Sequence, residues 1–95
     1  MNESNPSDAA LAELLSLTME VNDNGATIYR NQHGHCHRIH GPAVIWADGD
    51  CEWYQNDLLH RTDGPALTWP DGDKYWYLNG RKLTEEECNE RIRSM

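Results

Sequence analysis

One stretch of the chain is written twice, and this duplication constrains the fold more than any other feature. The run "HRIHGPAVIWADGD" begins at His37, and the run "HRTDGPALTWPDGD" begins at His60, an offset of 23 residues. The match continues beyond each run through Trp-Tyr and then Asn, and a worn third copy lies upstream around Asn24-Gly25. A period in this range is typical of a stacked supersecondary unit. We therefore expect three units, of which the first is degenerate.

Each unit contains a dipeptide that favours a tight β-turn. Asn-Gly or Asp-Gly tolerates the positive φ of a type I′ two-residue turn, and Gly-Pro marks the start of a strand because proline costs no ladder bond there. The turns fall at Asn24-Gly25, Asp48-Gly49 and Asp71-Gly72. Six strands are predicted in an antiparallel meander, over roughly 18–23, 26–31, 42–47, 50–56, 65–70 and 73–78.

The turn length determines which side chains share a face of the sheet, because the residues flanking a two-residue loop pair and side chains alternate along each strand. A two-residue loop places Val44 opposite Trp53. The same rule places all four tryptophans on one buried side and the four tyrosines, with Glu52, on the open side. The two sets are Trp46, Trp53, Trp69 and Trp76, and Tyr29, Tyr54, Tyr75 and Tyr77.

Two helices are predicted to cover the tryptophan side, since four indoles left in water would be an aggregation hazard. The first places Leu11, Leu14 and Leu15 on one stripe. The second begins at Thr84 with Glu87 three positions on, a capping box. The expected class is α+β, a six-stranded antiparallel β-meander of three hairpin repeats with an N-terminal and a C-terminal helix. The expected order is a helix over 7–17, hairpins over 18–83 and a helix over 84–94, in a single domain of residues 1–95.

Charge and composition exclude several classes of protein. A formal net charge of -8 argues against direct nucleic-acid binding, because phosphate contacts need a cationic surface. The longest apolar runs are only a few residues, so neither a signal peptide nor a membrane span is predicted. Cys36, Cys51 and Cys88 are odd in number and irregularly spaced, which favours reduced thiols in the cytoplasm. The second and third of these are expected in the core.

The duplicated pattern "HRxxGPAxxWxDGDxxWYxN", followed by Asn79-Gly80 and "LTEEE", resembles the MORN-like short repeats of small proteins from bacteriophages, prophages and large DNA viruses. The resemblance covers residues 18–87. It implies hairpins in a single extended sheet and a phage accessory role, hence a location in the host cell cytoplasm. No catalytic motif and no functional residue transfers with it.

Histidine and cysteine gather in one segment, and both are ligands that Zn²⁺ prefers. His37 and His60 recur with the repeat, so they are expected to serve the scaffold. No Cys-x-x-Cys pair exists, and we predict solvated or hydrogen-bonded histidines rather than a metal site. The unshared candidates are His33, His35, Cys36 and His40.

Arg38 and Arg61 have two interpretations. Their planar guanidinium groups could bind a phosphate or carboxylate of a ligand. Alternatively, each pairs with an acidic neighbour such as Asp63 or Asp48, because repetition at equal spacing is what interlocking hairpins require. No nucleophile has a specified base, so no catalytic residue, cofactor or enzymatic activity is predicted.

Three functions fit these residues. The first is a non-enzymatic phage-type accessory protein that binds and inhibits a host protein, such as an anti-phage defence protein. Its predicted contact surface consists of Tyr29, Tyr54, Tyr75, Tyr77 and Glu52, since tyrosine is enriched at interfaces. The second is a homo-oligomer that sequesters a nucleotide-like immune signal with Arg38 and Arg61. The third is a structural or virion-associated interaction module.

Overall fold

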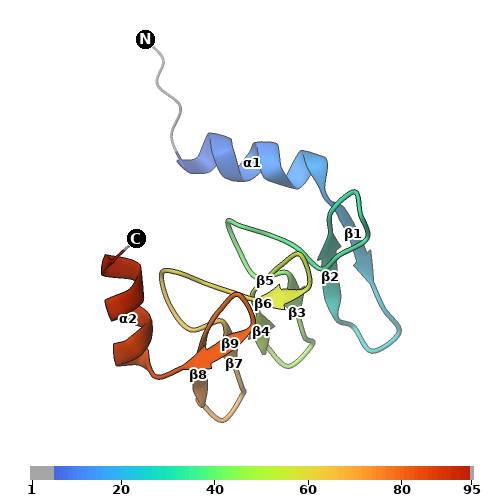
Figure 1. The fold of residues 1–95 in the computed structure, drawn as a ribbon. Helices are drawn as coiled ribbons and strands as arrows, with labels where there is room; N and C mark the ends of the chain where they lie inside the picture. The colour runs from blue at the N-terminus through green and yellow to red at the C-terminus, as the bar shows by residue number, and fades with distance from the viewer. Residues whose placement is uncertain (1–5, 95) are drawn as a thin grey trace.

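The computed structural model describes residues 6–94, with side chains described from Asp8 onward. Its architecture is α+β, with an antiparallel sheet between two helices, as the sequence predicts at this level. Helix α1 (Pro6–Ser16) precedes the strands and helix α2 (Glu85–Arg93) follows them. Figure 1 shows the strands in an extended row, with β1 and β2 at one end and α2 at the other.

The main sheet has seven strands in the order β1-β2-β3-β4-β7-β8-β9, and a second sheet pairs β5 with β6. The sheet therefore has more strands than the six predicted, because the chain after β4 turns out of the main sheet and β9 extends its far edge. Every pairing is antiparallel. The bounds are β1 (Thr18–Val21), β2 (Thr27–Arg30), β3 (Val44–Ile45), β4 (Cys51–Glu52), β5 (Tyr54–Gln55), β6 (Leu58–Leu59), β7 (Leu67–Thr68), β8 (Lys74–Leu78) and β9 (Arg81–Leu83).

The three predicted turns each contain one residue more than a type I′ turn. In the central one, Trp46 N donates to Asp50 O (2.9 Å) and Gly49 N donates to Trp46 O (3.0 Å), so the loop has three residues. Gly49 has a φ of +98°. This is the type I turn followed by a left-handed glycine that closes three-residue hairpins. The same two bonds close the turns at Gly25 and Gly72.

The extra residue shifts the pairing register by one position, so the predicted faces are wrong. Val44 pairs with Glu52 rather than with Trp53. A one-residue slip turns one strand of each pair over, because side chains alternate along a strand. Two rows of directly paired residues define the true faces. The Glu52 face contains Ile28, Val44, Glu52, Leu67 and Tyr75, and the Cys51 face contains Thr27, Ile45, Cys51, Thr68 and Lys74.

The tryptophans divide between these faces instead of sharing one buried side. By alternation, Trp46 and Trp69 belong to the Glu52 face, and Trp46 Nε1 donates to Glu52 Oε2 at 2.7 Å. These two side chains are 36% and 45% exposed. Trp53 and Trp76 belong to the Cys51 face and are half-buried. The sheet is thus a thin layer with aromatic residues on both sides.

Helix α2 closes one end of the sheet. Thr84 Oγ1 accepts from Glu87 N at 3.0 Å, and Glu87 Oε1 accepts from Thr84 N at 2.9 Å, so the predicted capping box is confirmed. These bonds lower the pKa of Glu87. The helix packs Cys88, which is 1% exposed, against the sheet. The buried cluster here consists of Leu78, Leu83 and Cys88, with Trp76 and Ile92 against it.

Helix α1 does not cover the sheet, contrary to the prediction. Leu11 and Leu15 are 59% and 81% exposed, and Figure 1 shows the helix beside a loop rather than on a sheet face. The helix is held instead by Glu13, whose carboxylate accepts from Ile39 N (2.6 Å) and His40 N (2.9 Å). Because the tryptophans are divided between the two faces of the sheet, neither face is apolar enough for the leucines of α1 to pack against it. No helix among residues 6–94 is long and apolar enough to cross a membrane.

Candidate binding surface

Arg61 interlocks neighbouring parts of the chain. Its guanidinium carbon lies 3.8 Å from the centroid of the Trp53 ring. Its Nε donates to Asp63 Oδ1 at 2.8 Å, and its Nη1 donates to Pro65 O at 3.1 Å. A Cβ on Gly64 would come within 2.8 Å of the guanidinium carbon. The Gly-Pro of the motif therefore leaves room for this arginine, and the predicted pairing with Asp63 is confirmed.

Arg38 repeats most of this arrangement. Its guanidinium carbon lies 4.4 Å from the centroid of the Tyr29 ring, and its Nη1 donates to Pro42 O at 3.3 Å. The acidic partner is missing, because His40 occupies the position that corresponds to Asp63. The buried Nε of Arg38 consequently has no hydrogen-bond partner within residues 6–94. Both arginines of the ligand-binding alternative are thus engaged inside the molecule.

The histidines of the motif also bind backbone. His37 Nδ1 accepts from Asn56 N (3.1 Å), and His60 Nδ1 accepts from Asn79 N (3.0 Å). Both asparagines have a φ of +51°, which asparagine tolerates better than most residues. Burial lowers the pKa of His60, which keeps Nδ1 free to accept. The prediction that these two histidines serve the scaffold is confirmed.

Of the remaining histidines, His33 and His35 lie near each other, with ring centroids 6.1 Å apart. His40 Nδ1 is 3.2 Å from Glu13 Oε1, and His35 Nε2 is 4.0 Å from Asp57 Oδ2. Among residues 6–94, no three His, Cys, Asp or Glu side chains are arranged to hold a metal ion. Burial raises the pKa of the Cys36 thiol, which favours its unreactive protonated form.

The predicted tyrosine surface is only partly assembled. Tyr54 OH donates to Glu52 Oε1 at 2.8 Å, and burial followed by this bond raises the Tyr54 pKa well above its usual range. Tyr75 and Tyr77 belong to the same face by alternation along β8. Tyr29 belongs to the opposite face, beneath Arg38, because the register differs from the predicted one. The four tyrosines therefore do not form one contact surface.

A groove on the Glu52 face combines exposed indoles with carboxylates. It has a volume of about 370 Å³. Its lining residues are Asn24, Trp46, Ala47, Asp48, Asp50, Glu52 and Trp69. The sequence interpretation missed this groove because a two-residue turn places both tryptophans in the core.

Asp50 is the unusual residue of the groove. It is 6% exposed, and its Oδ1 is buried without a hydrogen-bond partner among the described residues. Burial, and then the nearby carboxylates Asp48, Asp71 and Glu52, raise the Asp50 pKa. The corresponding residue of the following turn, Asp73, is exposed. The carboxylate of Asp50 is thus held in an environment that disfavours its charge.

Asp50→Asn is expected to change how stability depends on pH. A carboxyl group whose pKa is raised by folding binds more protons in the native than in the unfolded state, so native stability falls as pH rises through that range. The wild-type protein should lose stability above about pH 4 through this residue, because 3.8 is its ordinary pKa. The variant should lack this loss. Denaturant unfolding of both proteins from pH 4 to 8 checks it, and a constant difference across that range contradicts it.

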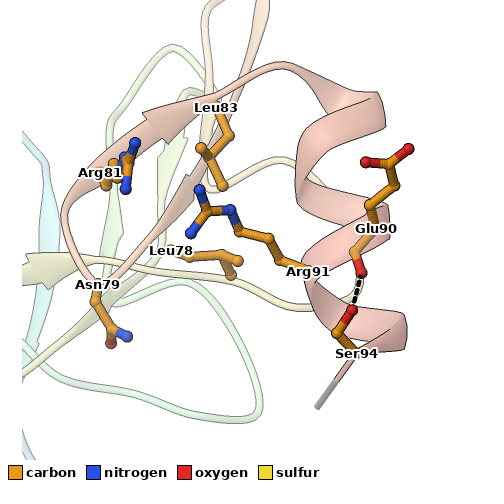
Figure 2. Close-up of a pocket in the computed structure, with 7 residues that line it drawn as sticks. All are labelled: Leu78, Asn79, Arg81, Leu83, Glu90, Arg91 and Ser94. Carbon is orange, nitrogen blue, oxygen red and sulfur yellow. Dashed lines mark hydrogen bonds between the residues drawn. The ribbon is translucent and has the colours of Figure 1, made fainter.

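A larger cavity than this groove lies elsewhere, between β8, β9 and α2. It has a volume of about 660 Å³. Figure 2 shows the side chains of Arg81 and Arg91 beside Leu78 and Leu83. Among residues 6–94, neither arginine has an ion-pair partner within 4.0 Å. The cavity therefore combines an apolar wall with two cationic groups and one carboxylate, that of Glu90. The excess of positive charge suits an anionic ligand that has an apolar part.

No family model, no curated protein and no solved structure matches the chain. The two surfaces differ in their chemistry. The groove offers aromatic faces and negative charge to a partner, and the cavity offers positive charge and aliphatic carbon.

Proposed function

We propose that this chain is a non-enzymatic binding protein that recognises another protein through the Glu52 face of its sheet. The observation that carries the proposal is the exposure of Trp46 and Trp69 on that face, at 36% and 45%. Tryptophan and tyrosine are enriched at interfaces and dominate binding energy there. Glu52 accepts hydrogen bonds from both Trp46 Nε1 and Tyr54 OH, so this part of the surface is held in shape before a partner arrives.

The proposed setting follows from the MORN-like resemblance. On this proposal the chain consists of three hairpin repeats and is a phage-type accessory protein that inhibits a host protein, such as an anti-phage defence protein, in the host cytoplasm. The contacts of Arg61 and His60, which recur at Arg38 and His37, support the repeat assignment. A structural or virion-associated module would use the same face without inhibiting its partner.

A second candidate function is sequestration of an anionic, nucleotide-like ligand. The cavity at Arg81 and Arg91 favours it, because its guanidinium groups lie beside apolar carbon and have no ion-pair partner within the described range. Arg38 and Arg61, which the sequence singled out for this role, are engaged with Tyr29, Trp53 and backbone carbonyls. For this function the proposed ligand site is therefore the cavity at the end of the sheet and not the pair Arg38 and Arg61.

Capture from host lysate, combined with the mass of the captured complex, tests the first proposal. We expect the wild-type chain to retain one host protein and the variant Trp46→Ala/Trp69→Ala to lose it. Trp46 is only 36% exposed and donates to Glu52, so the variant should lose some stability. Far-UV circular dichroism at the capture temperature must therefore show that the variant is folded. Arg81→Ala/Arg91→Ala serves as the matched double variant and should retain the partner. Loss of the partner only in the arginine variant contradicts the proposal.

The captured protein also separates inhibition from a structural role. Its activity is measured with and without a stoichiometric excess of the purified chain, and we expect a loss that the tryptophan variant does not cause. Thermal shift with adenine-containing cyclic nucleotides tests the second candidate, since a ligand that binds only the native state raises the melting temperature. A shift that Arg81→Ala/Arg91→Ala abolishes would support sequestration.

A further inference from the structure

The groove between Trp46 and Trp69 combines the exposed aromatic surface with negative charge. Its lining includes three carboxylates, Asp48, Asp50 and Glu52, and no basic side chain. With a volume of about 370 Å³, it has room for one long side chain rather than for a secondary-structure element. A cation is the group that both the indole faces and the carboxylates would attract.

Asp50 supplies an independent indication that a partner group belongs here. Buried carboxylates in native proteins are normally paired or hydrogen-bonded, because an isolated buried charge is costly. Asp50 is 6% exposed, lines the groove, and has a buried Oδ1 that accepts no hydrogen bond from the described residues. Asp73, at the matching position of the next turn, is exposed and is not part of the groove. The unsatisfied oxygen is therefore a property of this position and not of the turn sequence.

Hydrogen bonds fix the positions of several side chains that line the groove. Trp46 Nε1 donates to Glu52 Oε2 at 2.7 Å, and Tyr54 OH donates to Glu52 Oε1 at 2.8 Å. Both oxygens of Glu52 thus have partners, and the Trp46 ring, which is 36% exposed, is held by its nitrogen. Asp48 Oδ1 accepts from Asp50 N at 3.1 Å. The acceptors that remain inside the groove are the second oxygen of Asp48 and the carboxylate of Asp50, of which only Asp50 is buried.

We infer that this groove binds an arginine side chain of the partner protein, with its guanidinium group stacked on an indole and hydrogen-bonded to Asp50. The inference rests on the proposed function and names the group that the Glu52 face recognises. Arginine fits better than lysine because its planar guanidinium group stacks on aromatic rings and forms two parallel bonds with a carboxylate. A net charge of -8 would draw a basic partner surface toward this face.

The test is a titration of the full chain with the blocked tripeptide Gly-Arg-Gly, followed by NMR of the four indole N–H groups. We expect the signals of Trp46 and Trp69 to shift saturably below about 20 mM, since single side-chain contacts give dissociation constants near 1 mM or above. The signals of Trp53 and Trp76 should stay in place. Gly-Lys-Gly should bind more weakly. Equal binding of the lysine peptide, or no shift at the two groove indoles, overturns the inference.

Asp50→Asn and Asp73→Asn form the matched pair of variants. Each removes one carboxylate from a corresponding turn position, so the net charge of the chain changes by the same amount in both. We expect affinity for Gly-Arg-Gly to fall by about tenfold only in Asp50→Asn, because a bond to a charged group is lost there. An equal effect of the two substitutions means attraction by net charge and overturns the inference.

The experiments distinguish failure of this inference from failure of the proposed function. If Asp50→Asn still captures the host protein while Trp46→Ala/Trp69→Ala does not, the partner uses the indoles without an arginine and only this inference fails. If the tripeptide binds as expected but no partner is captured, the groove has the stated specificity and the proposed function fails. Asp50→Asn is expected to fold, since it removes a buried charge and leaves an isosteric amide.

Discussion

Leu83→Ala should lower the free energy of unfolding by about 2–4 kcal/mol, a large part of the ~5–14 kcal/mol expected for a domain of this size. Leu83 is 8% exposed and packs in the buried cluster with Leu78 and Cys88. This cluster connects α2 to the sheet. Truncating the side chain leaves a cavity in a core too small to close around it. Chemical unfolding followed by far-UV circular dichroism measures the loss.

Leu15→Ala is the matched control, because it makes the same chemical change on α1. Leu15 is 81% exposed, so its removal should cost less than about 0.5 kcal/mol. Equal destabilisation by the two substitutions would mean that α1 is packed after all and would contradict the description of that helix. A loss at Leu83 below about 1 kcal/mol would contradict the assignment of the core.

Arg61→Ala should cost about 2–4 kcal/mol, although arginine is ordinarily a surface residue. The substitution removes the cation–π contact with Trp53 at 3.8 Å and leaves Pro65 O without its donor. It also removes the donor from Asp63 Oδ1. A structural role of this kind affects stability whether or not any ligand is present. Thermal and denaturant unfolding without added ligand therefore measure the effect.

Arg61→Lys separates charge from geometry. Lysine keeps the positive charge but lacks the planar group that stacks and bonds to two acceptors, so we expect it to restore less than half of the lost stability. Arg93→Ala, on the exposed end of α2, should cost less than about 0.5 kcal/mol. Full rescue by lysine would show that charge alone matters and that the stacked arrangement is not what stabilises the protein.

What could be predicted from the sequence depends on how far apart the interacting residues lie along the chain. The capping box of Thr84 and Glu87 was predictable, because both partners lie within one helical turn and their bonds need nothing from the rest of the fold. The α+β class and the turn positions were predictable for the same reason. The stacking of Arg61 on Trp53 was not, since Trp53 lies between β4 and β5 and only the folded chain brings the two side chains together.

The prediction of two-residue turns was wrong, and this error affected the assignment of both sheet faces. Asp-Gly fits a two-residue type I′ turn and also a three-residue turn that ends in a left-handed glycine. The aspartates that precede the turn glycines indicate the three-residue type. Asp48 Oδ1 accepts from Asp50 N and Asp71 Oδ1 accepts from Asp73 N, the local bond by which aspartate stabilises such turns. Because one residue reverses a strand's faces, this single choice hid the groove between the exposed indoles.

Three aromatic rings on the Cys51 face are packed against different groups. Arg38 lies over Tyr29 and Arg61 lies over Trp53, whereas Trp76 packs against the cluster that α2 completes. A chain truncated before Thr84 would leave an uncovered indole, and the segment shaped to occupy that gap is the His-Arg and Gly-Pro stretch of another molecule. We therefore expect a chain truncated in this way to associate head to tail. Helix α2 completes the cluster against which Trp76 packs, at the end of the row where Arg38 and Arg61 cover the other two rings.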